Sequence, residues 1–399
     1  MSLPLRFNRM EVAGSLGDLG TLLPIAMAMI LINGLPALGV FFCIGLFYIL
    51  AGLFYGVTVP VQPMKVIGAY AIATALTPEQ IAASALLLGI ILLLVGWTGI
   101  IDLIRRITPK SVIRGIQLST GTLLLSSGIR FMLGTTQFQN VQQAAEPALA
   151  LQHFGPLPIG VVFGVLGGLV TLFLINNRRW PGGLAVLVLG TGCGLLFGAG
   201  SGLGDVDPGL YLPSLLPFGL PGGADLSFAL LALVLPQLPM TLGNACLAYT
   251  DLAEHYFEKQ AQRVTNKNAC FSMGLANLTA FILGGMPMCH GAGGLAAHYR
   301  FGARTAGSNL IIGTLFLGLA LVFGPHSVAL LQLLPLAILG VLLVFAGAQL
   351  ALTILDLETR KELFVAVLIM GITLAANLAV GFVVGVGVAW VLKSERFGI

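Results

Sequence analysis

Residues 81–100, IAASALLLGIILLLVGWTGI, carry no charged side chain over twenty consecutive positions. A helix of this length and composition crosses the ~30 Å hydrocarbon core of a bilayer. Within that core every backbone N–H and C=O group must be satisfied by the protein, so the segment has to fold as an α-helix. Similar runs recur throughout the chain, which is 57% hydrophobic and 9% charged. The sequence therefore predicts an all-α polytopic membrane protein.

Apolar runs separated by polar residues predict about fourteen membrane segments. The third, the tenth and the last are too short to span the bilayer alone. One helix start is especially clear, because Thr77-Pro78-Glu79-Gln80 is a capping box with proline at the first helical position. The predicted segments are 12–32, 37–56, 63–76, 80–101, 110–130, 157–175, 183–200, 227–250, 267–283, 287–299, 305–324, 327–352, 362–378 and 380–392.

The basic residues predict the orientation of these segments. With a cytoplasmic N-terminus and alternating passes, 17 of the 19 Lys and Arg residues fall on the cytoplasmic side, and the outer loops 131–156 and 201–226 contain none. This distribution follows the positive-inside rule and predicts a protein of the inner cell membrane with both termini in the cytoplasm. The cytoplasmic set is Arg6, Arg9, Arg105, Arg106, Lys110, Arg114, Arg178, Arg179, Lys259, Arg263, Lys267, Arg300, Arg304, Arg360, Lys361, Lys393 and Arg396.

An internal repeat connects the two halves of the chain. Three pairs of residues are 226 positions apart, and Pro60 and Pro287, at the two short segments, are 227 apart. Seven segments per copy is an odd number, so the second copy enters the membrane upside down, as in the inverted repeats of secondary transporters. We expect 1–200 and 201–399 to form the two copies. The three pairs are Asp18 with Asn244, Glu79 with Thr305, and Pro109 with Pro335.

Helix-breaking residues precede both short segments, in TVPVQPMKVIGAY (58–70) and GGMPMCHGAGGLA (284–296). Non-helical backbone is tolerated at membrane depth where it is buried in protein or lines a cavity. We expect each stretch to enter the membrane extended and to continue as a half-helix, with Pro63 and Pro287 in the first helical turns. Two helix N-termini facing each other expose unpaired N–H groups and partial positive charge, which together form an anion site.

Polar residues near these half-helices complete the predicted site. Lys65 falls in the first turn of one half-helix and His290 at the corresponding place in the other. We expect the proline-containing stretch LPQLPMTLGNA (235–245) to be distorted and to face the site. Its repeat partner is GSLGDLGT (14–21), in which Asp18 is a candidate proton-coupling residue, as is His290. The neutral candidates on these elements are Gln62, Gln237, Thr241, Asn244, Ser15 and Thr21.

Each assignment has a structural alternative. Lys65 can simply pair with Asp18, and Asp18 can serve as a helix–helix hydrogen-bond acceptor instead of titrating. His290 can be a packed, satisfied histidine, and Cys289 a small wall residue. For three further residues we expect peripheral positions: His298 at the membrane interface, and Asp251 and Glu254 in a surface loop.

Three stretches resemble a known family: PVQPMK (60–65), MPMCHGAGGLAAH (286–298) and GSLGDLGTLLP (14–24). They are similar to the molybdate transporter family, a relative of the SulP sulfate permeases, and the resemblance covers residues 10–395. It implies a seven-plus-seven inverted repeat with core and gate subdomains. It further implies uptake of molybdate, with sulfate or tungstate as competitors. The family's motif positions map to Gln62, Lys65, Cys289 and His290.

Two features depart from the pattern that the resemblance implies. The chain continues for only seven residues after the last segment, so we expect no C-terminal cytoplasmic regulatory domain. Segment 8 offers amides and a hydroxyl where related proton-coupled carriers have an acid, which leaves the coupling residue open. The complete predicted substrate-binding set is Gln62, Lys65, Met288, Cys289, His290, Gly291, Gln237, Thr241, Asn244, Ser15 and Thr21.

These observations predict a secondary transporter that imports a tetrahedral oxyanion, with segments 1–4 and 8–11 moving as a substrate-carrying core. The partners we expect are molybdate, protons as the coupling ion, the lipid bilayer and, by family analogy, a second copy of the chain. We expect no cofactor, bound metal, nucleic acid or enzymatic activity. The alternatives are a sulfate or other oxyanion exchanger, an anion channel on the same fold, and a soft-metal carrier using Met286, Met288, Cys289 and His290.

Overall fold

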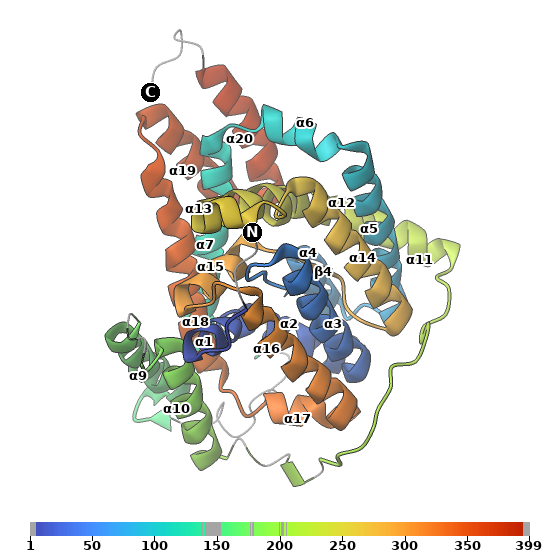
Figure 1. The fold of residues 1–399 in the computed structure, drawn as a ribbon, viewed down its shortest axis with the longest axis vertical. Coiled ribbons are helices and arrows are strands. Elements are labelled where there is room, and N and C mark those ends of the chain that lie inside the picture. The colour runs from blue at the N-terminus through green and yellow to red at the C-terminus, as the bar shows by residue number, and fades with distance from the viewer. Residues whose placement is uncertain are drawn as a thin grey trace.

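The computed structural model is almost entirely helical (Figure 1). It describes residues 5–136, 139, 153–175, 177, 179–198, 200, 203–204 and 206–393. Arg178, Arg396 and most of the predicted outer loop 131–156 therefore lie outside the described residues. Five helices are long and apolar enough to cross a membrane, or six if α1 and α2, which meet at 42°, form one bent span.

The first half of the chain follows the predicted segments closely. In the described part of this half, α6 is the helix that was not predicted, a short amphipathic helix in the predicted loop between segments 4 and 5. The helices of this half are α1 (Arg9–Ser15), α2 (Leu19–Leu31), α3 (Ala37–Tyr55), α4 (Lys65–Thr74), α5 (Pro78–Thr98), α6 (Ile100–Ile107), α7 (Lys110–Leu133), α9 (Ile159–Leu174) and α10 (Gly182–Leu196).

The second half departs from prediction at segment 12, which is interrupted between α17 and α18. Pro335 is the N-cap of α18, where proline can begin a helix but cannot continue one. The helices are α11 (Gly223–Phe228), η2 (Ala229–Val234), α12 (Leu235–Met240), η3 (Thr241–Ala248), α13 (Tyr249–Phe257), η4 (Glu258–Ala261), α14 (Asn266–Leu283), α15 (Ala292–Phe301), α16 (Ala306–Gly318), η5 (Leu319–Phe323), η6 (Gly324–His326), α17 (Ser327–Leu331), α18 (Leu336–Ala351), η7 (Leu352–Asp356), α19 (Arg360–Ala375) and α20 (Leu378–Leu392).

Local sequence signals explain several boundaries. Thr77 and Gln80 form the predicted capping box at the start of α5. Pro109 caps α7 as Pro335 caps α18. The predicted distortion of segment 8 is confirmed, because η2 and η3 are π-helical turns on either side of α12. Pro239 lies inside α12, where its missing N–H removes a regular hydrogen bond.

Two short strands cross at the centre of the molecule. β1 (Gln62–Pro63) pairs antiparallel with β4 (Met288–Cys289), with Gln62 opposite Cys289 and Pro63 opposite Met288. A separate hairpin of β2 (His153–Phe154) and β3 (Leu157–Pro158) precedes α9. Each central strand leads into a short helix, α4 or α15. The expected half-helices therefore exist, and each follows an extended stretch.

The predicted helix starts at Pro63 and Pro287 are wrong. Pro63 lies in β1, and α4 begins two residues later at Lys65. Pro287 immediately precedes β4, and α15 begins only at Ala292. Both prolines thus stand in extended backbone, which their fixed φ also permits. The Pro287 carbonyl instead accepts a hydrogen bond from the Met64 N–H at 3.0 Å, which joins the two stretches.

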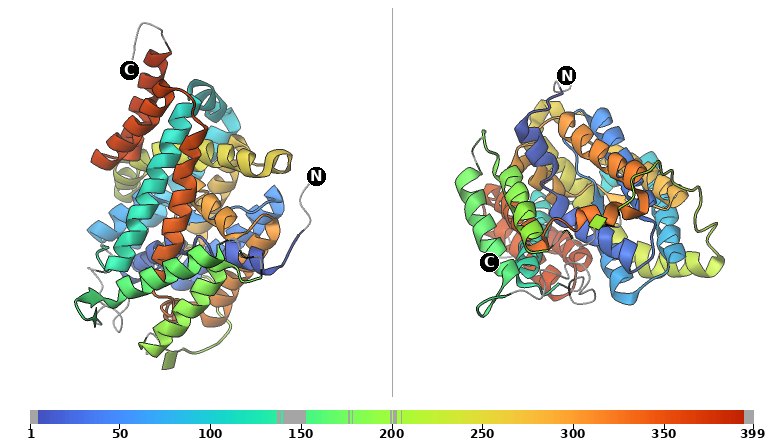
Figure 2. Two further views of the ribbon diagram at one scale, coloured as in Figure 1. Left: turned by 90° about the vertical axis from the view of Figure 1, so that its left-hand side faces the viewer. Right: turned by 90° about the horizontal axis from the view of Figure 1, so that it is seen from below.

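Close helix packing surrounds this crossing. α7 packs along α18, α5 along α14, and α3 along α16, and the left view of Figure 2 shows α7 and α18 side by side. Glycines make the first contact possible, because a Cβ atom at Gly121 would lie 2.6 Å from the Gly347 carbonyl oxygen, and the reverse also holds. Small residues at helix crossings are the usual means of close approach in membranes.

Candidate functional site

Two asparagines hold the extended stretches in place. The side chain of Asn277 in α14 accepts a hydrogen bond from the Met288 N–H at 3.0 Å and donates one to the Met288 carbonyl at 2.8 Å. Asn309 of α16 does the same for Val59, at 2.9 and 2.8 Å. All four residues are completely buried. Each amide replaces the neighbouring strand that an isolated extended segment lacks, so the backbone is satisfied without water.

The first turn of α15 is built almost without side chains. Gly291 is its N-cap, followed by Ala292, Gly293 and Gly294. The N–H groups in such a turn have no acceptor within their own helix. A Cβ atom at Gly294 would lie 2.8 Å from the Gln62 amide nitrogen and would also collide with Asp18. One at Gly291 would collide with the Gln62 amide oxygen. These glycines therefore let polar side chains approach the helix end.

Asp18, Gln62 and Lys65 form a chain of hydrogen bonds at this helix end. The Gln62 amide donates to both carboxylate oxygens of Asp18, at 2.8 and 2.9 Å. Its oxygen accepts from the Lys65 ammonium at 3.3 Å. Asp18 and Gln62 are buried, whereas Lys65 is half-buried. Lys65 and Asp18 do not pair directly, and Gln62 links the predicted cation to the predicted coupling acid.

Gln237 of α12 caps the other half-helix. Its side-chain oxygen accepts from the Val66 and Ile67 N–H groups at 3.0 and 3.3 Å, in the first turn of α4. Its amide nitrogen donates to the Thr241 hydroxyl at 2.9 Å. The two N-termini therefore differ: that of α4 already has a neutral acceptor from the protein, and that of α15 is lined by glycine.

The remaining polar candidates lie around α15. Asn244 of η3 accepts from the Thr120 hydroxyl of α7 at 3.3 Å and lies beside Gly291. Thr21, in the first turn of α2, has a buried hydroxyl without a hydrogen-bond partner among the described residues. Ser15 ends α1 and donates to the Val12 carbonyl at 2.8 Å, so its hydroxyl is used locally.

The strand residues Met288 and Cys289 form the wall of the site. Both are buried, and Met288 belongs to the hydrophobic core. The Cys289 sulfur lies 4.0 Å from the Pro63 carbonyl oxygen across the strand pair. These contacts agree with the alternative in which Cys289 is a small residue in the wall of the site.

His290 has both ring nitrogens engaged within the protein, unlike the predicted ligand donor. Its Nδ1 donates to the Pro60 carbonyl at 2.8 Å, which leaves Nε2 to accept from the Ser272 hydroxyl at 2.8 Å. The ring stacks on Tyr249, with centroids 5.2 Å apart, and also contacts Phe47. The packed alternative describes this environment better than the donor role does.

Two peripheral assignments are wrong. His298 is completely buried, and its Nδ1 lies 2.8 Å from the Thr58 hydroxyl. Asp251 lies on the helix α13 and forms an ion pair with the buried Arg114 of α7. Glu254, also on α13, is exposed at the surface and pairs with Arg105 at 3.4 Å. Helical continuation of segment 8 through η3 into α13 explains why these acids do not form a loop.

The assembled chemistry favours a small anion. Partial positive charge from α15, the Lys65 ammonium and neutral donors such as Asn244 gather in one place. Among the residues that the structure describes, Asp18 is the one carboxylate hydrogen-bonded within this group. A soft-metal site is disfavoured because both His290 nitrogens are occupied and Met288 packs in the core. Among the residues that the structure describes, no three His, Cys, Asp or Glu side chains are arranged to hold a metal ion.

Sequence reasoning missed several residues that build this site. Asn277, Asn309 and Thr120 were not singled out, although all three are polar residues inside predicted membrane segments. A buried amide in a membrane helix needs a partner, and broken backbone nearby offers one. That combination was the available signal. Arg114 was counted only as a cytoplasmic charge, since nothing local reveals its two distant acidic partners.

Comparisons with known proteins identify the family of the chain. The family model described as molybdate transporter of the MFS superfamily matches residues 10–124 and 229–350. Molybdate transporter 2 of Arabidopsis thaliana is 31% identical, over 96% of this chain and 87% of its own. Molybdate transporter 1 of Chlamydomonas reinhardtii is 31% identical, over 96% of this chain and 92% of its own. The chain belongs to the molybdate transporter family. It is therefore a transport protein of the membrane and not an enzyme.

Two solved structures with a similar fold are described as a bicarbonate transporter and an anion transporter. The murine Slc26a9 anion transporter in its inward-facing state superposes with a TM-score of 0.62 at 15% identity, covering 100% of this chain and 70% of that one. The transmembrane domain of the cyanobacterial bicarbonate transporter BicA gives 0.58 at 16% identity, covering 97% and 98%. The family member described here thus has an SLC26-like fold and is an integral, multi-pass membrane protein.

The packing of His290 generates a prediction about stability. His290→Ala should remove two buried hydrogen bonds and leave a cavity among aromatic rings, at a cost of about 2–5 kcal/mol. Ser272→Ala, which removes one of the two partners, should cost less. We expect both variants to lower the unfolding temperature in detergent, in that order. A His290→Ala protein that keeps its unfolding temperature but loses oxyanion binding would show instead that the ring contacts the ligand.

Proposed function

We propose that the protein imports a tetrahedral oxyanion, most simply molybdate, by proton-coupled alternating access. The observation that carries this proposal is the convergence of the glycine-lined N-terminus of α15 with Lys65 beside a strand crossing. Curated relatives named molybdate transporters support the choice of substrate. Sulfate and tungstate share the tetrahedral shape and dianionic charge, so they are the natural competitors. On this proposal Gln62, Asn244 and Gly291 contact the ligand together with Lys65.

Contacts between helices support a seven-plus-seven inverted repeat with halves at 1–200 and 201–399. If each helix is replaced by its counterpart in the other half, the α3–α16 contact becomes the α14–α5 contact, and the α9–α10 contact becomes the α19–α20 contact. The α7–α18 contact and the β1–β4 pair convert into themselves. In this arrangement α1–α5 and α11–α16 form the core, and α7, α9, α10 and α18–α20 form the gate. If each short helix is counted as one membrane pass, this arrangement has fourteen passes.

Contacts among the basic residues support the proposed orientation in an inner cell membrane, with both termini in the cytoplasm. Several basic residues assigned to the cytoplasmic side contact residues from distant parts of the sequence that are assigned to the same side. Such contacts are expected if these segments lie together at one face of the membrane. These contacts are Arg9 with the Arg179 carbonyl at 3.1 Å, Arg105 with Glu254 at 3.4 Å, Lys110 with Asp356 at 3.3 Å, and Arg263 with the Phe54 carbonyl at 2.9 Å.

Coupling to protons is proposed on energetic grounds. Moving two negative charges into a cell against 100 mV costs roughly 4.6 kcal/mol, at ~2.3 kcal/mol per charge. Asp18 carries a negative charge near Lys65, because the side chain of Gln62 is hydrogen-bonded to both residues. Protonation of Asp18 would remove that charge and release the Gln62 amide from its carboxylate partner. Proton and dianion therefore favour each other's binding, as symport requires.

The first experiment measures molybdate binding to the purified protein by calorimetry. Lys65→Ala should weaken binding at least tenfold, because it removes the only full positive charge placed at the α15 N-terminus among the described residues. Lys65→Arg should retain part of the affinity. Lys259→Gln, a basic residue on the surface, serves as the matched control and should bind normally. Unchanged affinity in Lys65→Ala would refute the proposed site.

Proton coupling is tested by pH. Wild-type affinity for molybdate should rise as the pH falls from about 8 to about 6, because protonated Asp18 no longer repels the dianion. Asp18→Asn mimics the protonated carboxyl, so its affinity should change much less with pH. Its uptake into proteoliposomes should also lose its response to an imposed proton gradient. Asp225→Asn in α11 is the control. A variant at Asp18 with wild-type pH dependence would exclude this residue as the coupling group.

Alternating access requires a contact between core and gate that breaks, and Arg114 provides a candidate. This gate residue is 5% exposed and pairs with Asp251 of the core and with Asp356 of the gate. Its guanidinium also donates to the Gln117 amide oxygen at 2.9 Å. When the core moves, the pair with Asp251 would break while Asp356 keeps the arginine charge compensated. A buried charge that always has one partner avoids the large cost of isolation.

Asp251→Asn should therefore favour the state in which core and gate have separated at the Arg114–Asp251 contact. The measurement is the rate at which a soluble thiol reagent modifies a cysteine introduced at Thr120, one of the buried gate residues near α15. We expect a several-fold faster rate in Asp251→Asn than in the otherwise identical parent protein. Glu254→Gln, which breaks the exposed pair with Arg105, is the control. A rate that is unchanged or slower would remove Asp251 from the gating contact.

The main alternatives use the same site. An exchanger would drive oxyanion uptake with a counter-anion and would be indifferent to a proton gradient, and a channel would carry current without accumulation. Uptake into proteoliposomes against a concentration gradient, with and without a proton gradient, separates these mechanisms from symport.

A further inference from the structure

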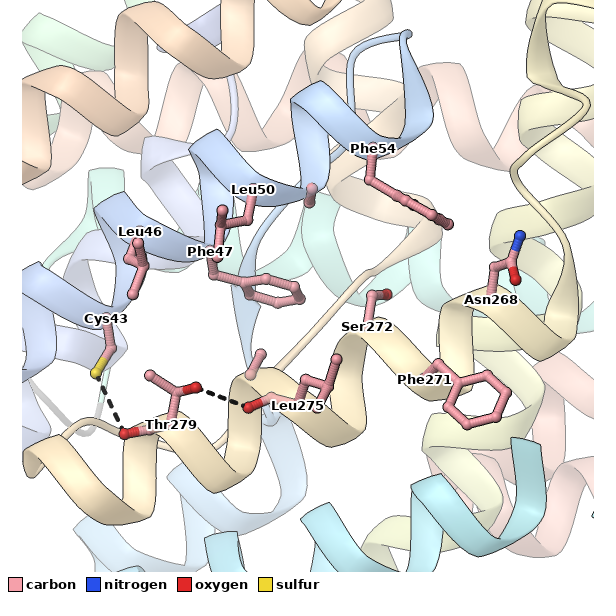
Figure 3. A pocket seen from close by; sticks show the side chains of 12 residues that line it. Cys43, Leu46, Phe47, Leu50, Phe54, Asn268, Phe271, Ser272, Leu275 and Thr279 are labelled. Carbon is pink, nitrogen blue, oxygen red and sulfur yellow. Dashed lines mark hydrogen bonds between the residues drawn. The ribbon is translucent and has the colours of Figure 1, made fainter. Parts of the chain in front are cut away.

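A groove between α3 and α14 lies outside the proposed oxyanion site. Its volume is about 290 Å³, and Figure 3 shows side chains of both helices converging on it. Nine of the twelve lining residues are apolar or cysteine. The lining consists of Cys43, Leu46, Phe47, Leu50, Ala51 and Phe54 from α3, and Asn268, Phe271, Ser272, Leu275, Ala276 and Thr279 from α14.

The groove opens toward the membrane. Leu50, Phe54 and Leu275 on its rim are 56%, 46% and 59% exposed, whereas Ala51 and Ala276 on its floor are buried. From Cys43 to Phe54 the lining follows eleven residues of helix, or roughly 16 Å at ~1.5 Å per residue. That length is about half of the ~30 Å hydrocarbon core, so the groove matches the depth of one leaflet.

One end of the groove carries unpaired positive charge. The Arg263 guanidinium stands 6.0 Å from the centroid of the Phe54 ring and donates to the Phe54 carbonyl at 2.9 Å. The Lys267 ammonium stands 6.0 Å from the centroid of the Phe271 ring. Among the described residues neither cation forms an ion pair. Both therefore keep donors for an anionic group at the membrane surface.

We propose that this groove binds one anionic phospholipid, with an acyl chain between α3 and α14 and its phosphate at Arg263 and Lys267. An apolar slot of one-leaflet depth ending in two free cations is complementary to such a molecule and to no water-soluble anion. Basic pockets at the cytoplasmic ends of membrane helices are typical sites for anionic headgroups. The proposal rests on the chain spanning a membrane and not on its transported substrate.

The floor of the groove connects this lipid site with the central strands. Ser272, on the floor, forms hydrogen bonds with the Tyr55 hydroxyl at 2.8 Å and with His290 at 2.8 Å. The Phe47 ring contacts the same histidine in a tilted arrangement, with the ring centroids 4.9 Å apart. His290 in turn holds the Pro60 carbonyl. A bound acyl chain would therefore pack against the side chains that support the β1–β4 crossing and should stabilise it.

The test uses purified full-length protein in nanodiscs, with native mass spectrometry counting retained lipids. In phosphatidylcholine doped with phosphatidylglycerol, we expect wild-type protein to retain phosphatidylglycerol preferentially. The double variant Arg263→Gln/Lys267→Gln should retain at least fivefold less. Leu275→Trp, at the exposed rim, fills the groove from the lipid side without a buried clash and should lose the lipid with both cations intact. Arg106→Gln/Lys259→Gln removes two exposed charges elsewhere and should behave as wild type.

Several results would overturn the proposal. One is equal retention of phosphatidylglycerol in wild-type protein and in both groove variants, and another is equal retention of phosphatidylcholine and phosphatidylglycerol by the wild type. Thermal unfolding provides a second readout, since added phosphatidylglycerol should raise the unfolding temperature of the wild type and not of Leu275→Trp. Molybdate binding in the same samples is measured separately, so failure of the lipid site leaves the oxyanion site testable on its own.

Discussion

Satisfaction of backbone hydrogen bonds at the centre of the molecule is the constraint on which the rest of the structure depends. Two segments give up helical geometry there, and hydrocarbon offers them no alternative partner. The pairing of β1 with β4 meets part of that need. Asn277 and Asn309 meet more of it, because each forms hydrogen bonds with both backbone groups of one residue in an extended stretch. These amides lie on α14 and α16, which in turn pack on α5 and α3, so the outer helices fix the crossing.

Once the crossing is fixed, the positions of the polar side chains follow. The extended stretches deliver Gln62 to the glycine-lined end of α15, and only glycine at positions 291 and 294 lets it come so close. Gln62 then joins Asp18 to Lys65 through a single amide. A change of charge on Asp18 consequently reaches Lys65 through one rotatable side chain. Proximity of this kind is a direct physical basis for coupling a proton to an anion.

Much of this architecture could be predicted from the sequence, because membrane segments and helix caps are local signals. The capping box at Thr77, the distortion around Pro239 and the half-helices themselves were all recognisable. The strand pairing was not, since a proline looks equally suitable for an extended stretch and for a first helical turn. Contacts between residues far apart in the sequence could not be predicted either. His290 and Lys65 occupy similar positions in the sequence, yet only the His290 ring is packed among aromatic side chains.

That difference between His290 and Lys65 has a further physical meaning. A histidine ring with both nitrogens engaged and aromatic neighbours is well suited to hold a wall rigid. A lysine that is half-buried and bonded to one amide oxygen retains donors and freedom to move. His290 therefore supports the strand crossing through its hydrogen bonds, whereas Lys65 keeps a full positive charge beside Gln62.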